Sequence, residues 1–224
     1  KSYKQLTHKT RLFAPSLSPN GKTIIAVDIS YSNQISLVEL SAETGREVKR
    51  YESPQNLMLQ TPSYNSSGQK VVVVAVSQEG KTLFILDRET GIFEQIIPFQ
   101  RQLLSRPAFA EDKIIFKAHY NGIDNLYSLD PATKEILQLT SVKYGVLNPS
   151  YSHESNQIYF SNYQVNGYDI SSIPYPKKEM ALADIKQYSA NYIAPIREQE
   201  GNKNVFEDIP GEKYPSKPYR EVNN

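Results

Sequence analysis

The sequence predicts an all-β fold, namely a β-propeller of about four to five four-stranded blades, closed or partial, with an irregular C-terminal extension. A unit made of a Pro-Ser segment, a tight turn and two apolar strands occurs four times. Its marker prolines are spaced by 47, 45 and 42 residues and are Pro15, Pro62, Pro107 and Pro149. Such a period is typical of a radial β-repeat. Because four units are at the lower limit for a closed ring, we favour a partial propeller cut from a longer protein; the alternative is a tail that fills part of a fifth blade.

The first unit, residues 13–40, shows the pattern most clearly. A Pro-Ser segment leads into residues 19–21, whose sequence Pro-Asn-Gly favours a tight turn. A β-branched stretch at residues 23–29 predicts a strand, and residues 34–40 predict a second strand after a polar hairpin. The same elements recur in residues 61–87, 106–130 and 148–173.

The strands within a unit differ in their hydrophobic pattern. Residues 71–76 form a continuous apolar run, which predicts a strand covered on both faces by neighbouring blades. The following strand ends at a turn that requires a positive φ, supplied by Gly45 and Gly91 and, in the third unit, by Lys134. Short outermost strands are expected after these turns.

Two parts of the chain are predicted. Residues 1–176 form the blades, and residues 177–224 form an irregular connector or tail that leads to a further domain in a longer protein. Residues 4–7 (Lys-Gln-Leu-Thr) match residues 137–140 (Leu-Gln-Leu-Thr), which close the third unit as its outermost strand. We therefore expect an incomplete first blade, with ring closure between the two chain ends as the alternative.

Composition excludes several classes of function. The 224 residues include 25 basic and 24 acidic side chains, and a net charge of +1 without a basic run argues against nucleic-acid binding. Cysteine is absent, so neither a disulfide nor a thiolate metal site can form. No apolar run approaches the roughly 18 to 20 residues that a transmembrane helix requires.

Units one and two share a longer motif, in which Pro-Ser, a further serine and a turn glycine precede the apolar strand. These residues are Pro15, Ser16, Ser18 and Gly21, and Pro62, Ser63, Ser67 and Gly68. Over roughly residues 12–173 the pattern resembles the TolB-like, or WD40-like (PD40), propeller repeat. It is also similar to the propeller of prolyl oligopeptidase and dipeptidyl peptidase IV relatives. The motif builds turns and cores, so it indicates the fold more strongly than the function.

The resemblance implies a non-catalytic scaffold that binds a protein or peptide partner in the periplasm, at the cell surface or outside the cell. Residues 212–220 resemble the linker that leads to a membrane-associated domain in large TolB-like surface proteins. The alternative is the accessory propeller of an enzyme, either an S9-type peptidase or a metal-dependent polysaccharide lyase.

The sequence contains no catalytic constellation. A Gly-x-Ser-x-Gly nucleophile motif is absent. The histidines, His8, His119 and His153, belong to different units and lack metal-binding spacing. We predict no catalytic residue, no metal and no cofactor. The minor alternatives are a metal held in the channel by distant histidines and calcium bound at residues 121–125.

Tyrosine is the main amphipathic aromatic residue, since the chain has 16 tyrosines and no tryptophan. Tyr31, Tyr120 and Tyr163 occupy comparable hairpin positions in three units. They are therefore the predicted binding residues, on a face presented to a partner. Alternatively, these rings fill the spaces between blades.

Overall fold

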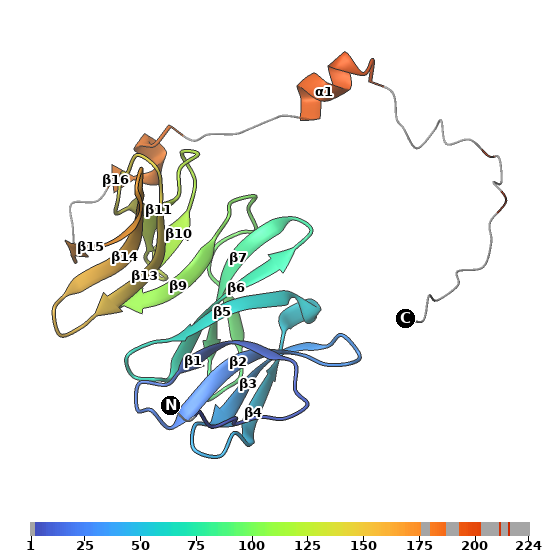
Figure 1. Ribbon diagram of the computed structural model, residues 1–224, viewed down its shortest axis with the longest axis vertical. Coiled ribbons are helices and arrows are strands. Elements are labelled where there is room, and N and C mark those ends of the chain that lie inside the picture. The colour runs from blue at the N-terminus through green and yellow to red at the C-terminus, as the bar shows by residue number, and fades with distance from the viewer. Residues whose placement is uncertain (1–2, 176–179, 187–192, 203–210, 212–214, 216–224) are drawn as a thin grey trace. The chain divides into compact units, whose positions relative to one another are not determined.

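Each sequence repeat forms its own antiparallel sheet in the computed structural model (Figure 1). The structure describes residues 3–175, 180–186, 193–202, 211 and 215. Blade 1 contains β1 (Leu12–Leu17), β2 (Thr23–Ile29), β3 (Ile35–Ser41) and β4 (Glu47–Glu52). Blade 2 contains β5 (Met58–Tyr64), β6 (Lys70–Ser77), β7 (Gly80–Asp87) and β8 (Phe93–Gln95).

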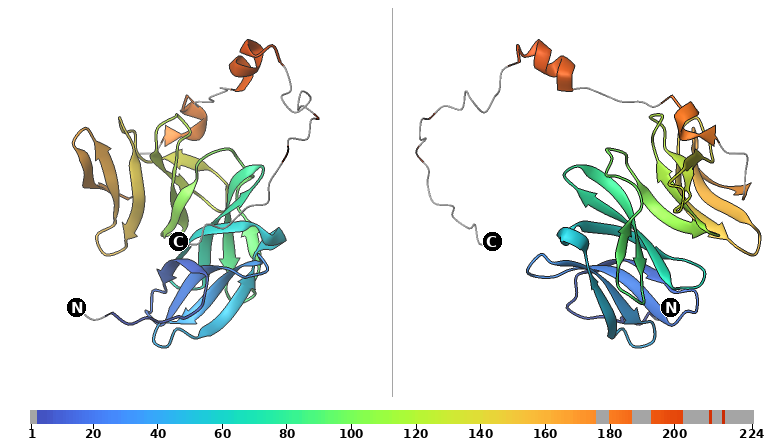
Figure 2. Two further views of the ribbon diagram at one scale, coloured as in Figure 1. Left: turned by 45° about the vertical axis from the view of Figure 1, so that its right-hand side comes forward. Right: turned by 180° about the vertical axis from the view of Figure 1, so that it is seen from behind.

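The third and fourth blades follow the same order along the chain. Blade 3 contains β9 (Ser105–Ala110), β10 (Lys113–Ala118), β11 (Asn125–Leu129) and β12 (Ile136–Gln138). Blade 4 contains β13 (Val146–Ser152), β14 (Gln157–Gln164) and β15 (Gly167–Pro174). Contacts join β1 to β5, β5 to β9 and β9 to β13, so the blades lie side by side (Figure 2). The fold is therefore the predicted all-β propeller arrangement, in partial form.

The Pro-Ser segment of each repeat is itself the innermost strand, rather than only the approach to a turn. In every blade the register shifts at the repeat proline, and the residue before it has a positive φ of 48° to 54°. These residues are Ala14, Thr61, Arg106 and Asn148. Within the part of the chain that the structure describes, each inner strand pairs with a strand on one side, so a proline without an N–H is tolerated there in a bulge.

The core is divided among the spaces between successive blades. Val71 and Val73 of β6 pack with Ile25 of blade 1, whereas Val72 and Val74 pack toward blade 3. A third cluster joins blades 3 and 4. Since β6 is covered on both faces, its continuous apolar run is explained and the prediction for residues 71–76 is confirmed.

The turn residues adopt the predicted conformations. Gly45 and Gly91 have φ values of 71° and 77°, and Lys134, which replaces glycine in blade 3, has a φ of 64°. In the turns after the inner strands of blades 3 and 4, Glu111 and Asn156 adopt φ values of 54° and 50°. The turns of the repeat thus keep their backbone conformation where another residue replaces glycine.

The N-terminal segment contacts blade 1 in the same way as the outermost strand of blade 1 contacts blade 2. Lys4 Nζ donates a hydrogen bond of 2.7 Å to the Glu43 carbonyl in the turn after β3. One repeat later, Lys49 Nζ of β4 donates to the Glu89 carbonyl at 3.2 Å, in the turn after β7. The segment therefore occupies the same place beside blade 1 as β4 occupies beside blade 2.

The predicted tail begins with ordered structure. The strand β16 (Met180–Ala181) pairs with β12 and extends the sheet of blade 3, and the short 3-10 turn η2 (Leu182–Asp184) follows. The compact unit that holds the blades runs from Lys1 to Tyr188, and a second unit, Ser189–Asn224, contains α1 (Ile193–Gln199). None of the helices in the described residues has the length and apolar character that a membrane crossing demands.

Candidate functional site at the inner strands

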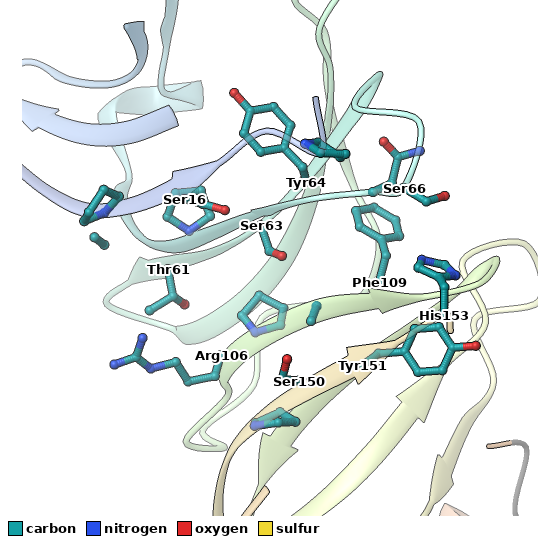
Figure 3. Close-up of a pocket in the computed structure, with 18 residues that line it drawn as sticks. Ser16, Thr61, Ser63, Tyr64, Ser66, Arg106, Phe109, Ser150, Tyr151 and His153 are labelled. Atoms are coloured by element: carbon teal, nitrogen blue, oxygen red, sulfur yellow. The ribbon is translucent and has the colours of Figure 1, made fainter. Parts of the chain in front are cut away.

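A cavity of about 500 Å³ is lined by the inner strands of all four blades (Figure 3). The bulges at the repeat prolines lie along its wall, as do residues of the turns that follow the inner strands of blades 1, 2 and 4. Bulges and positive φ values concentrate in functional regions of proteins because they redirect side chains. The cavity is therefore the candidate functional site.

The wall of the cavity carries hydroxyl groups at repeated positions. The serine after the repeat proline lines it in three blades, as Ser16, Ser63 and Ser150, while Ala108 takes this place in blade 3. None of these three hydroxyls has a hydrogen-bond partner within the part of the chain that the structure describes. The Oγ1 atom of Thr61 is buried and has no partner among the described residues either. The three serine hydroxyls are therefore free to bind a polar ligand.

Arg106 introduces a positive charge into this wall. It lies directly before Pro107 in the bulge of β9, with a φ of 52°, and its side chain is exposed. The other blades place Ala14, Thr61 and Asn148 at this position. Figure 3 shows Arg106 and His153 at opposite sides of the cavity.

Glu111, Tyr151 and His153 form a cluster that joins blade 3 to blade 4 at the cavity. The Tyr151 hydroxyl donates to Glu111 Oε1 at 2.6 Å, and His153 Nδ1 lies 3.0 Å from the same oxygen. The hydrogen bond from Tyr151, and then that from His153, hold the pKa of the Glu111 carboxyl below its ordinary value. Burial and the nearby Glu111 raise the pKa of Tyr151 to about 12. The carboxylate therefore serves as an acceptor that connects two blades.

A second set of perturbed groups lies between blades 1 and 2. Glu39 is buried and is bound by Arg88, whose Nη2 donates to Glu39 Oε2 at 2.8 Å. Arg88 also donates to the carbonyl of Gly68, and the Tyr64 hydroxyl donates to Glu39 Oε1 at 3.3 Å. Burial raises the pKa of Tyr64 to about 12, and Glu39 raises that of Arg88. This network fixes one blade against the next, and Glu39 and Arg88 line a smaller cavity of about 330 Å³.

The three predicted binding tyrosines do not form a common exposed face. Tyr31, in the β2–β3 hairpin, is 84% exposed, and Tyr163, on β14 beside Tyr168, is 45% exposed. Tyr120 is only 2% exposed, because its ring packs on Tyr127 and its hydroxyl donates to Gln100 Oε1 at 2.9 Å. Tyr120 therefore lies in the apolar cluster between blades 2 and 3, in agreement with the alternative that these rings fill the spaces between blades.

None of these tyrosines lines the cavity between the inner strands. Tyr31 instead borders a second cavity of about 440 Å³ between the N-terminal segment and blade 1. The residues that sequence reasoning missed are the repeated serines, Thr61 and Arg106. A signal was present in the case of Arg106, since it is the one charged residue that directly precedes a repeat proline.

The histidines remain separate in the structure. His119 Nδ1 accepts a hydrogen bond of 3.1 Å from the Leu103 amide, His153 is engaged with Glu111, and His8 borders the second cavity. Within the described ranges, no group of three or more histidine or carboxylate side chains is placed to hold a metal ion.

Neither a protein-family model nor a curated protein sequence matches the chain. Several solved structures resemble it in fold. TolB from Acinetobacter baumannii superposes with a TM-score of 0.64 at 14% identity, over 79% of this chain and 44% of TolB. A manganese-bound oligogalacturonate lyase gives 0.63 at 16% identity, over 79% of this chain and 55% of the lyase. A puromycin hydrolase gives 0.57 at 13% identity, over 84% and 31% of the two chains.

The chain thus spans less than half the length of the TolB structure. At these identities the likeness concerns the fold, and function must be argued from the site. The repeated sheets, the bulged inner strands and these superpositions together show that the chain has the fold of the TolB-like propellers.

Proposed function

We propose that the chain is a non-catalytic propeller scaffold that binds a protein partner by taking an extended peptide segment into the cavity between its inner strands. The observation that supports this function is the lining of the cavity. It consists of four edge strands together with hydroxyl groups that have no partner among the described residues.

The edge strands supply the recognition chemistry for a peptide. Among the described residues, each of the inner strands β1, β5, β9 and β13 is hydrogen-bonded to a single neighbouring strand. Their remaining N–H and C=O groups are available on the free side, and an extended peptide binds such groups by main-chain hydrogen bonds. The serine side chains then add contacts that depend on the peptide sequence.

The arrangement of the cavity residues favours a scaffold over an enzyme. Nucleophilic catalysis requires a hydroxyl within hydrogen-bond reach of a base. In the described part of the chain, neither Ser63 nor Ser150 is bonded to a histidine, and His153, the histidine in the lining, is engaged with Glu111. The alternative function is an accessory propeller of an S9-type peptidase or a metal-dependent polysaccharide lyase, which the fold likeness to puromycin hydrolase and oligogalacturonate lyase favours.

The resemblance to TolB-like propellers also supports a location in the periplasm, at the cell surface or outside the cell. In this setting the chain forms part of a larger protein, with a membrane-associated domain as the expected neighbour. Expression of the full coding region followed by cell fractionation tests this proposal. Recovery of the protein with the cytoplasmic fraction contradicts it.

Selection of displayed peptides against the wild-type chain and a variant with a filled cavity tests the proposed function. Ser150→Trp places a large side chain at the cavity wall, and Ser172→Trp, an equal change at an exposed site on β15, is the control. We expect displayed peptides that bind the wild-type chain and the Ser172→Trp variant but fail to bind Ser150→Trp. Peptides that bind all three proteins equally contradict the proposed site, and catalytic turnover of peptide or polysaccharide by the purified chain supports the enzyme alternative.

A further inference from the structure

The titratable side chains that line the cavity include basic groups but no carboxylate. Its lining residues include Arg106 and His153 but no aspartate or glutamate. The carboxylate of Glu111 contacts two lining residues, Tyr151 and His153, but Glu111 itself lies outside the lining. Arg106 has no ion-pair or hydrogen-bond partner in the described part of the chain. The cavity therefore holds a positive charge that no acidic side chain among the described residues neutralises.

Two further cations lie near the strand that carries Arg106. Lys81 Nζ donates a hydrogen bond of 3.3 Å to the carbonyl of Leu104, two residues before Arg106. Lys117 is paired with Ser105 in the β9–β10 ladder, and its Nζ lies 2.8 Å from Asp124. Burial and then the charge of Lys117 lower the pKa of Lys81. In this region Lys117 is paired with Asp124, whereas neither Lys81 nor Arg106 has a carboxylate partner among the described residues.

The bulge in β9 fixes the backbone position from which the Arg106 side chain extends. The ladder between β9 and β10 shifts register between Ile115 and Lys117, opposite Arg106. A positive φ at a non-glycine residue is costly and persists where the surrounding strands impose it. Because Pro107 fixes its own φ and restricts the residue before it, the Arg106 side chain begins from a rigid point on the cavity wall.

Hydroxyl groups complete a site for a carboxylate. A guanidinium binds the two oxygens of a carboxylate through parallel N–H groups. Ser63 and Ser150 place hydroxyl groups without partners among the described residues on the same wall. A single arginine suits a single carboxylate, whereas a polyphosphate chain requires several cations along its length.

We propose that Arg106 binds a carboxylate of the peptide in the cavity, so that the partner presents an acidic segment. This inference rests on the proposed function. A peptide is favoured over an acidic sugar because free strand edges surround the site, and sugars stack on exposed aromatic rings. Of the aromatic rings in the lining, Tyr64 is buried beneath Arg88, Tyr151 is engaged with Glu111, and Phe109 packs against the apolar cluster between blades 2 and 3.

Titration of the isotope-labelled full chain tests the proposal by nuclear magnetic resonance. The probes are N-acetyl-Asp-Gly-Asp-amide, its Asn-Gly-Asn counterpart and galacturonate, and the readout is the Arg106 Nε–Hε signal with the amides of Ser63 and Ser150. The variants are Arg106→Gln and, as the control, Arg101→Gln, which removes an exposed arginine outside the lining. We expect the acidic peptide to shift these signals saturably. Arg106→Gln should weaken that binding about tenfold, and Arg101→Gln should leave it unchanged.

The outcomes separate this inference from the proposed function. If both peptides shift the cavity amides equally and Arg106→Gln has no effect, peptide binding stands and carboxylate recognition is wrong. If neither peptide shifts them, both proposals are wrong for this cavity. If galacturonate binds more tightly than the acidic peptide, the site recognises carboxylates on sugars and the peptide partner is contradicted.

Discussion

The spaces between blades 1 and 2 and between blades 2 and 3 have the same backbone frame but different chemistry. In the first, buried Glu39 on β3 meets Arg88 from the turn after β7. One repeat later the corresponding residues are Ile85 and Pro131, and the space is filled by an apolar cluster that includes Phe116 and Tyr127. The repeat therefore specifies strands and turns, while individual side chains decide how each pair of blades is joined.

Because one interface contains a buried ion pair and the other is apolar, we expect the two interfaces to differ in their tolerance to mutation. A buried ion pair stabilises little in net terms, because removing two charges from water offsets their attraction. Loss of one partner is costly, however, since the other charge is then buried alone. An apolar interface loses stability gradually as methyl groups are removed.

Arg88→Leu should have the largest effect. It leaves Glu39 buried without its cation and should lower the free energy of unfolding by about 3–5 kcal/mol, measured by urea denaturation. The double variant Glu39→Ile with Arg88→Leu gives the first interface the apolar character of the second. It should recover most of the loss, and equal instability of the single and double variants contradicts the ion-pair explanation.

Gly45→Ala and Gly91→Ala compare the same turn in two blades. Both residues have positive φ, but a Cβ at position 45 would clash with the Leu6 carbonyl oxygen, whereas at position 91 the nearest atom, on Tyr51, is 3.7 Å away. Each substitution should cost about 1–3 kcal/mol for the backbone conformation. Gly45→Ala should cost more, because it also displaces the N-terminal segment. Equal losses of stability would show that the segment does not pack there.

Ile114→Val measures the apolar interface. Ile114 is fully buried between blades 2 and 3, and removing one methylene group should cost about 1 kcal/mol in urea denaturation. The exposed Ile92 provides the control, since Ile92→Val should change stability by less than about 0.5 kcal/mol. A loss at position 114 as large as that of Arg88→Leu contradicts the contrast between the two interfaces.

Glu111→Gln should have the smallest effect and should depend on pH. The pKa of Glu111 is lower in the folded chain than its ordinary value of 4.5, so the unfolded chain binds the proton more readily. The contribution of the carboxylate is therefore present above that value and is lost as the pH falls through the folded pKa. The stability difference between the wild type and Glu111→Gln should shrink between about pH 6 and about pH 3. A difference that does not change with pH, or an equal one for the exposed Glu79→Gln, contradicts this role.

Much of the fold could be predicted because turns and apolar runs are local signals. The positive φ at Lys134 and the two-sided burial of residues 71–76 follow from the repeat pattern. The innermost strand could not be recognised, since a proline in a short polar segment indicates a turn unless the bulge and the single neighbouring strand are known.

The candidate site depended on tertiary contacts that the sequence does not display. Tyr31 and Tyr120 occupy equivalent hairpins, yet Gln100, from the loop after β8, covers only Tyr120. Arg106 reaches the cavity because its bulge lies opposite a shifted register in β10. Equivalent positions in a repeat thus differ in exposure when their neighbours from other blades differ.

The most direct measurement is a crystal structure of the full chain with the peptide N-acetyl-Asp-Gly-Asp-amide bound. We expect an Asp carboxylate of the peptide within hydrogen-bond distance of the Arg106 guanidinium, with the peptide backbone along the free edges of the inner strands. A peptide bound instead on the exposed tyrosines of blade 4 or beside Tyr31, with the cavity between the inner strands unchanged, would contradict it.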